Sequence, residues 1–266
     1  MNNNNANKKR NPLKKRLLRY PGQSLDYDMG NLQQDIYILL FVSVISVVLA
    51  VNEWVQWFLH LPPSPLVPSI GAAAIVAYSS VKIWRLRKRL SNYELGQMGE
   101  REVAQILDKL KLKGYTVFHD VLAPDFNIDH VVISPRGIFA VETKTYSKPG
   151  RGEAKVTFDG ENVTLTGHRP DPRPVMEAVR HAAWLRNSIL KDSIVTKKLF
   201  EVKPVVVFTG WWVPKGYSKD IWVLNPGMIE IQIEMEPISL TDVDIAIAIA
   251  RLEPYSTTST DDSTGE

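Results

Sequence analysis

Residues 127–144 read NIDHVVISPRGIFAVETK, and this stretch decides the fold. Two apolar segments, 128–133 and 138–143, flank Ser-Pro-Arg-Gly, a tetrapeptide that favours a turn. The pattern predicts two antiparallel strands joined as a hairpin. If the turn is centred on its Pro-Arg pair, Asp129 on the first strand lies directly opposite Glu142 on the second.

Three polar side chains of this hairpin form a candidate site. Alternate residues of a strand share a face, so Glu142 and Lys144 point the same way. Opposed residues have Cβ atoms roughly 4.5–5.5 Å apart, and two carboxylates that close repel each other unless a cation lies between them. Carboxylate oxygens suit Mg²⁺ or Mn²⁺, so we expect Asp129 and Glu142 to bind that metal beside Lys144. The alternative is that these side chains form only surface salt bridges. His130 points away from Asp129 on its strand, and we expect it to have a structural role.

The remaining patterns predict an α/β domain over residues 91–254 with a mixed sheet flanked by helices. The expected helices share apolar faces or capping residues; they cover 94–112, 174–190 and a last segment that Ser239 and Asp242 cap and that ends at Leu252. The expected strands share apolar runs or alternation; they cover 115–122, 155–158, 163–166, 205–209, 221–224 and 229–236.

Two further acids bear on the site. Glu100 precedes Val103 and Leu107 by three and seven residues, which places it on the inward stripe of the first of these helices. A buried acid needs a partner, so we expect Glu100 to turn toward the hairpin carboxylates. The alternative is a favourable charge in a first helical turn. Glu177 and His181 are four residues apart and are expected to pair with each other.

The first third of the chain has the pattern of a transmembrane helical hairpin. Apolar runs at about 36–59 and 66–84 are each close to the roughly 20 residues that a membrane helix needs. Three prolines between 60 and 65 end the first run and favour a turn. Two buried core helices or a helix lying in the membrane interface are the alternatives. Glu53 is expected near the headgroups, or else as a functional acid within the membrane.

Charge is distributed unevenly along the chain. Residues 1–89 carry 12 Lys and Arg against 4 Asp and Glu, a net charge of +8, so the rest carries −5 to give the total of +3. Basic flanks on both sides of the two apolar runs predict a multi-pass membrane protein with both termini in the cytoplasm. Residues 1–34 are expected to form a basic cytoplasmic tail, and 255–266 a disordered one. The absence of cysteine excludes disulfides and thiolate sites.

These motifs resemble those of two related groups of proteins. Asp129 followed by Glu142-Thr143-Lys144 resembles the Asp…(Asp/Glu)-x-Lys site of restriction-endonuclease-like nucleases. Over residues 95–210 the chain resembles the NERD, or nuclease-related, domain. That resemblance rests on the segments 96–102, 128–139, His181-Ala182-x-x-Leu185 and 205–210.

The resemblance implies a restriction-endonuclease-like fold and a metal-dependent nuclease. Asp129, Glu142, Lys144 and Glu100 would be its catalytic residues, Mg²⁺ or Mn²⁺ its cofactor, and nucleic acid its substrate, DNA ahead of RNA. Glu177 stands where the family often has glutamine, in an Asn-Pro-x-x-Gln pattern. That departure and the acidic soluble part leave open a catalytically inactive, membrane-tethered module that binds nucleic acid or protein. The sequence leaves the oligomeric state open.

Overall fold

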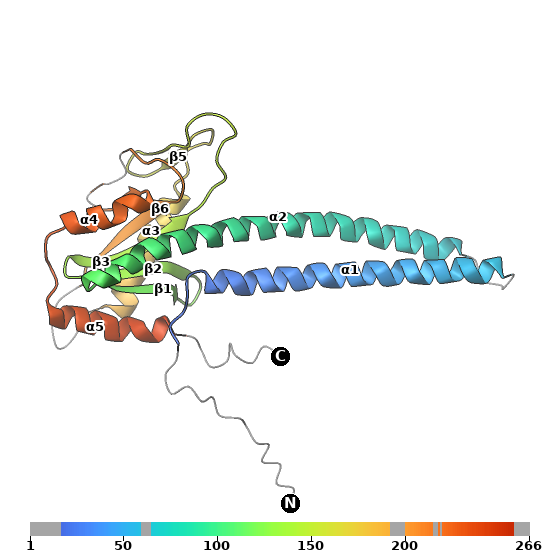
Figure 1. Cartoon of the computed structure of the whole chain (residues 1–266), viewed down its shortest axis with the longest axis horizontal. Helices are drawn as coiled ribbons and strands as arrows, with labels where there is room; N and C mark the ends of the chain where they lie inside the picture. The colour runs from blue at the N-terminus through green and yellow to red at the C-terminus, as the bar shows by residue number, and fades with distance from the viewer. Residues whose placement is uncertain (1–16, 60–64, 192–199, 215–217, 219, 258–266) are drawn as a thin grey trace, which may run out of the picture.

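The computed structural model describes residues 17–59, 65–191, 200–214, 218 and 220–257. A five-stranded mixed sheet is flanked by helices and is preceded by two long apolar helices (Figure 1). The predicted fold class, a mixed α/β sheet preceded by a helical hairpin, is confirmed.

The sheet is built around the predicted hairpin. Its order is β1-β2-β3-β6-β7, antiparallel from β1 to β3 and parallel from β3 to β7. The hairpin register is as predicted, with Ile133 opposite Ile138. The strands of this sheet are β1 (Thr116–Leu122), β2 (Asn127–Ser134), β3 (Gly137–Lys144), β6 (Val202–Phe208) and β7 (Trp222–Leu224). A separate hairpin consists of β4 (Val156–Phe158) and β5 (Val163–Leu165).

Helices cover both faces of the sheet. On one face, α2 (Leu66–Leu110) and α4 pack on side chains such as Val132 and Val141. On the other, α3, the π-helical turn that follows it and α5 pack on Val131 and Ala140. The bounds of these elements are α3 (Arg173–Trp184), the π-turn Leu185–Ile189, α4 (Ile229–Met235) and α5 (Asp242–Leu252).

The strand predicted at 229–236 is wrong, because these residues form the helix α4. Ile229 and Ile233, four residues apart, are buried against the sheet, whereas Ile231 and Met235 are exposed. A run of apolar residues at every second position contains this four-residue spacing as well as the strand period. The short helical turn Pro226–Met228 leads directly into α4 and favours the helical spacing.

The cap predicted for the last helix is displaced by two residues. Thr241 Oγ1 accepts from the N–H of Asp244 at 3.2 Å, and Asp244 Oδ2 accepts from the N–H of Thr241 at 2.9 Å, which is a capping box. Ser239 instead donates its backbone N–H to the carbonyl of Pro135 at 2.9 Å. Both Ser239-x-x-Asp242 and Thr241-x-x-Asp244 fit the pattern, and the contact with the hairpin turn selects the second.

The two apolar helices are longer than predicted. They are α1 (Gln23–Phe58) and α2 (Leu66–Leu110), and α2 unites the two predicted helices 66–84 and 94–112. The intervening residues 85–93 contain neither glycine nor proline, so nothing in them ends the helix. Figure 1 shows α1 and α2 side by side, extending far beyond the sheet. The proline-rich turn at 60–64 lies outside the described residues.

Both long helices are apolar and largely exposed over their hydrophobic windows. Each is long and apolar enough to cross a membrane, and only 6% and 11% of those windows are buried. Leu32 and Ile36 of α1 pack against Leu86 of α2. At the far end Trp54 Nε1 donates to Ser69 Oγ at 2.7 Å. The two helices therefore contact each other along most of their length and leave their other faces open.

Segments near the two ends of the chain lie against each other on the sheet domain. Leu18 bridges Thr257, and the N–H of Arg19 donates to the carbonyl of Ser256 at 2.8 Å. Ser256 is buried. Ser256 and Thr257 therefore depart from the disorder predicted for the C-terminal tail, because backbone pairing holds them. Residues 1–16 and 258–266 lie outside the described residues.

Candidate functional site

Asp129 lies where the ladder between β2 and β3 stops. The last pair is His130 with Val141. One step further, the N–H of Thr143 donates to Asp129 Oδ2 at 2.6 Å. The Asp129 carboxylate thus takes the place of a backbone acceptor, and this bond brings it to the part of β3 that carries Glu142.

Lys144 lies between two carboxylates. Its Nζ is 2.7 Å from Oε1 of Glu142, on the same face of β3, and 2.7 Å from Oε2 of Glu177 on α3. Glu142 and Lys144 therefore point to the same face of β3, as their alternation along the strand predicted. The pair expected between Glu177 and His181 is absent from these contacts, since the two residues reach different partners on β3.

His181 contacts the hairpin, whereas the sequence predicted only a pair with Glu177. Its Nδ1 lies 2.9 Å from Oε2 of Glu142, and its ring stacks on Phe126 with centroids 4.4 Å apart. Nδ1 and Oε2 are both buried and do not meet hydrogen-bond geometry with each other or with another described residue. The inward spacing of Pro174, Ala178 and His181 along α3 was the signal available for it.

The two hairpin carboxylates have opposite pKa shifts. Burial, then the charges of Glu142 and Glu100, raise the pKa of Asp129 well above its usual value. Burial also raises the pKa of Glu142, but His181 and Lys144 outweigh that effect and hold it below its usual value. Burial lowers the pKa of Lys144, and the carboxylates of Glu142, Glu177 and Asp129 together more than reverse this, so its net shift is upward. Glu142 and Lys144 therefore form an ion pair, whereas Asp129 retains a proton to higher pH.

Glu100 on α2 and the hairpin carboxylates are close enough for their charges to shift one another's pKa values. Burial raises the pKa of Glu100 to about 8, with further contributions from the charges of Asp120 and Glu142. The charge of Glu142 helps to raise the pKa of Glu100, and the charge of Glu100 helps to raise the pKa of Asp129, so the helix and the hairpin form one electrostatic group. The expectation that Glu100 turns toward the hairpin stays a prediction.

Asp120 is a further carboxylate, which the sequence interpretation missed. The β1–β2 ladder pairs His119 with His130 and Val121 with Ile128, and the position between them sets Asp120 opposite Asp129. That pair is absent from the ladder, and Asp120 has a φ of 50°, in the left-handed region. Backbone strain of this kind in a non-glycine residue is more frequent at functional sites.

The comparison with known proteins adds a family to this geometry. Residues 95–209 match the family model described as the nuclease-related domain, NERD. This part of the chain is a nuclease-related domain. It contains Glu100, Asp129, Glu142 and Lys144, and a nuclease-like function follows from the family at that level.

One curated protein is similar over a short segment. It is an uncharacterized protein of Bacillus anthracis, 43% identical over 56 residues, which are 19% of this chain and 26% of that protein. The chain thus spans about a quarter of the length of that relative. No solved structure matches the chain at a significant level.

On the face of the hairpin that α2 covers, two histidines lie against each other. His119 Nδ1 and His130 Nδ1 are 3.0 Å apart, and Asp108 Oδ1 lies 3.1 Å from His119 Nε2. Burial lowers the pKa of both imidazoles, more strongly for His130. A neutral, buried pair on the α2 side agrees with the structural role predicted for His130.

The donor set suits a divalent cation with few protein ligands. Among the described residues no three His, Asp or Glu side chains are grouped to hold a metal. Mg²⁺ is often held by one or two carboxylates together with water. Asp129 and Glu142 supply two, and Oε2 of Glu142, 2.9 Å from Nδ1 of His181, is buried. These residues fit such an ion.

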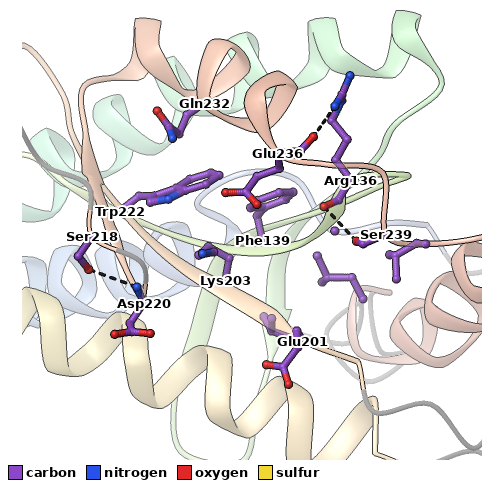
Figure 2. A pocket seen from close by; sticks show the side chains of 14 residues that line it. Arg136, Phe139, Glu201, Lys203, Ser218, Asp220, Trp222, Gln232, Glu236 and Ser239 are labelled. Atoms are coloured by element: carbon purple, nitrogen blue, oxygen red, sulfur yellow. Dashed lines mark hydrogen bonds between the residues drawn. The ribbon is translucent and has the colours of Figure 1, made fainter.

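Two cavities flank the nuclease-related domain's sheet at opposite ends. The larger, about 800 Å³, lies where β3 begins, over Phe139 and Trp222 and beneath α4 (Figure 2). None of the four candidate site residues lines it. A cavity of about 550 Å³ lies at the other end, between Gly99 of α2 and Thr145, with Arg101 and Lys148 in its wall. None of the four candidate site residues lines this cavity either, although Gly99 and Thr145 are next to Glu100 and Lys144 in the chain.

Proposed function

We propose that this protein is a membrane-anchored, Mg²⁺- or Mn²⁺-dependent nuclease that hydrolyses phosphodiester bonds of nucleic acid, with DNA preferred to RNA. The observation that carries the proposal is the convergence of Asp129, Glu142 and Lys144 at one edge of a nuclease-related domain. A carboxylate pair with a lysine one step along the same strand face has the chemical groups that a metal-assisted hydrolysis requires.

Asp129 and Glu142 would hold the ion, with the backbone carbonyl of Thr143 as a third oxygen. When bound, the ion would polarise the phosphodiester and lower the pKa of a coordinated water. The raised pKa of Asp129 supports this role, because its proton is the group that a cation would replace.

Lys144 would act as a cation rather than as a base. The carboxylate of Glu142 helps to raise the pKa of Lys144, so the ammonium form persists at neutral pH. That ammonium can donate hydrogen bonds to a phosphate oxygen and offset the charge that develops there. Glu100, with a pKa of about 8, carries a proton at neutral pH and could deliver it to a leaving oxygen.

Anchoring would place this chemistry on the cytoplasmic side of a membrane. Exposed basic residues of α2 at positions 82, 85, 87, 88 and 89 follow its apolar half, and seven more basic residues precede α1. Lys and Arg concentrate in cytoplasmic flanks of membrane helices. Both ends of the helical pair carry this signal, so both termini are assigned to the cytoplasm.

A second candidate function is a tethered module without catalysis. Glu177, in the place of the family's usual glutamine, pairs with Lys144 at 2.7 Å. The Glu177 carboxylate therefore competes with a phosphate for the Lys144 ammonium group. The nucleic acid or a protein would then be bound at the same edge without being cut.

The test is a cleavage assay on the full chain in detergent or nanodiscs. Single- and double-stranded DNA and RNA are incubated with Mg²⁺, with Mn²⁺ or with EDTA, and Lys144→Ala is the matched control. Metal-dependent cleavage by the wild type and not by Lys144→Ala supports the nuclease. Retarded but uncut nucleic acid supports the binding module. If the protein shows no cleavage and no binding, both candidate functions are ruled out.

A further inference from the structure

A buried ion pair joins the start of the membrane-proximal segment to the sheet. Arg19 donates from Nε and Nη2 to Asp120 Oδ2 at 2.8 and 2.6 Å, and the two side chains are 6% and 5% exposed. Burying an ion pair is costly unless both partners are well satisfied. Ser24 completes the set, since its hydroxyl lies 2.8 Å from Asp120 Oδ1 and its N–H donates to Oδ2 at 3.1 Å.

The same segment contacts Glu100. The backbone N–H of Gly22, which has a φ of 73°, donates to the Glu100 carboxylate. A Cβ on Gly22 would lie 3.0 Å from Cγ of Gln97 and 3.5 Å from Oε2 of Glu100. Gln97 Nε2 in turn donates to Asp26 Oδ1 at 2.5 Å. One turn of α2 is therefore held by the residues that open α1.

Charge explains why these contacts matter for the site. Asp120 occupies the β1 position opposite Asp129, which itself lies beside Glu142 and Glu100. Repulsion among these acids adds to the effect of burial in raising the pKa of Glu100 and of Asp129, and Lys144 is engaged by Glu142 and Glu177. Arg19 supplies the second cation, from a position 101 residues away in the sequence.

We propose that residues 18–26, the clasp segment, are a positioning element of the catalytic site: Arg19 and Ser24 fix and neutralise Asp120, and Gly22 fixes Glu100. The inference rests on the proposed nuclease function and deepens it. The catalytic unit then includes the residues that lead into the first apolar helix. A merely structural clasp would tie the same segments together without affecting the carboxylates of the hairpin.

The test compares full-length variants in detergent. Arg19→Ala leaves Asp120 buried without its cation, Arg19→Lys keeps the charge, and Arg19→Ala with Asp120→Asn removes both charges. Lys113→Ala is the matched control, since it breaks an ion pair with Glu230 and Glu234 on α4. Each variant is assayed for the rise of melting temperature with Mn²⁺ and for the kcat and KM of DNA cleavage.

For Arg19→Ala we expect kcat to fall about tenfold or more with KM within about twofold, because positioning affects the reacting geometry. The Mn²⁺-dependent rise should increase, because the carboxylate group has lost a competing cation. Arg19→Lys should recover part of kcat, the double variant should restore the wild-type Mn²⁺ response, and Lys113→Ala should match the wild type in both.

Two results would overturn the inference in distinguishable ways. If the wild type responds to Mn²⁺ and cleaves DNA, and Arg19→Ala changes only the melting temperature without metal, the clasp segment is structural and the nuclease proposal stands. If the wild type neither responds to Mn²⁺ nor cleaves, the nuclease proposal fails and the positioning role fails with it.

Discussion

Oε2 of Glu177 on α3 lies 2.7 Å from Nζ of Lys144 on β3. A second carboxylate on the same ammonium group, beside Glu142, strengthens the hold on that proton and competes with a phosphate for it. The residue on α3 thus bears on how available Lys144 is to substrate.

Replacing Glu177 tests that competition. Glu177→Gln keeps an oxygen acceptor for Lys144 and removes one negative charge, so cleavage should rise several-fold at an unchanged Mn²⁺ response. Arg173→Gln, which breaks an exposed ion pair with Asp171 at the start of α3, is the control. A loss of cleavage in Glu177→Gln would mean that the carboxylate itself takes part in the reaction.

Two substitutions in the hairpin separate metal binding from chemistry. A ligand that binds only the folded protein raises its melting temperature, so Mg²⁺ or Mn²⁺ should stabilise the wild type. Asp129→Ala removes a proposed ligand and should abolish that rise. Lys144→Ala removes a neighbouring cation and should keep the rise while abolishing cleavage. A rise that survives Asp129→Ala would place the ion elsewhere.

Glu100 should make the metal-free protein less stable as the pH rises. Its pKa is about 8 in the folded state against an ordinary 4.5. Between these values the folded state binds a proton that the unfolded chain has released, so this stabilisation is complete below pH 4.5 and is lost as the pH rises through about 8. His119 and His130, whose pKa values are lowered, act in the opposite direction only below about 6.5.

The measurement is the free energy of unfolding in EDTA between pH 6.5 and 8. Glu100→Gln should flatten the decline seen in the wild type. Because Asp129 also has a raised pKa, part of the decline should remain in that variant. Identical slopes in the two proteins would mean that Glu100 titrates normally.

Gly99 has no room for a side chain. A Cβ there would lie 1.8 Å from Thr145 Oγ1, on the loop that follows β3. Gly99→Ala should therefore cost about 1–3 kcal/mol of unfolding free energy. Gly96→Ala, three residues earlier in the same helix, meets its nearest atom at 3.8 Å and should gain about 1 kcal/mol from helix propensity. Equal effects on thermal or chemical unfolding would contradict the close approach of α2 to this loop.

Topology can be checked with a reporter that is active only outside the cytoplasm. Fused after Glu266 it should be silent, because basic residues follow the second apolar run and cytoplasmic flanks are basic. Inserted between α1 and α2 it should be active. Activity at the C-terminus would contradict a hairpin with both ends inside.

The sequence predicted the hairpin well because a short turn leaves one register. With Ser134 paired to Gly137, the approach of Asp129 to Glu142 followed from counting. The β1–β2 connection lacks so short a turn, so its register was open and Asp120 was missed. A positive φ at Asp120 and a contact with Arg19 across 101 residues arise only from the packed chain.

Two other departures have local causes. The alternation in 229–236 contains both the strand period and the spacing of Ile229 and Ile233, and only contact with the sheet decides between them. His181 was assigned to Glu177 by spacing alone, whereas the stacking of Phe126 and the burial of Glu142 direct its ring to β3. Metal binding, membrane insertion and substrate stay predictions.

Because α2 is unbroken, it fixes the distance between the end of the apolar run and the candidate site. From Trp84, at the end of the apolar run, to Glu100 the helix continues for 16 residues, which at 1.5 Å each is about 24 Å. A domain on a flexible tether would sample a wide volume of cytoplasm. In the proposed anchor, the continuous helix would hold the carboxylates at a nearly constant height above the bilayer, about the width of a nucleic-acid duplex. In the proposed membrane-anchored nuclease, the site would meet nucleic acid close to the membrane surface.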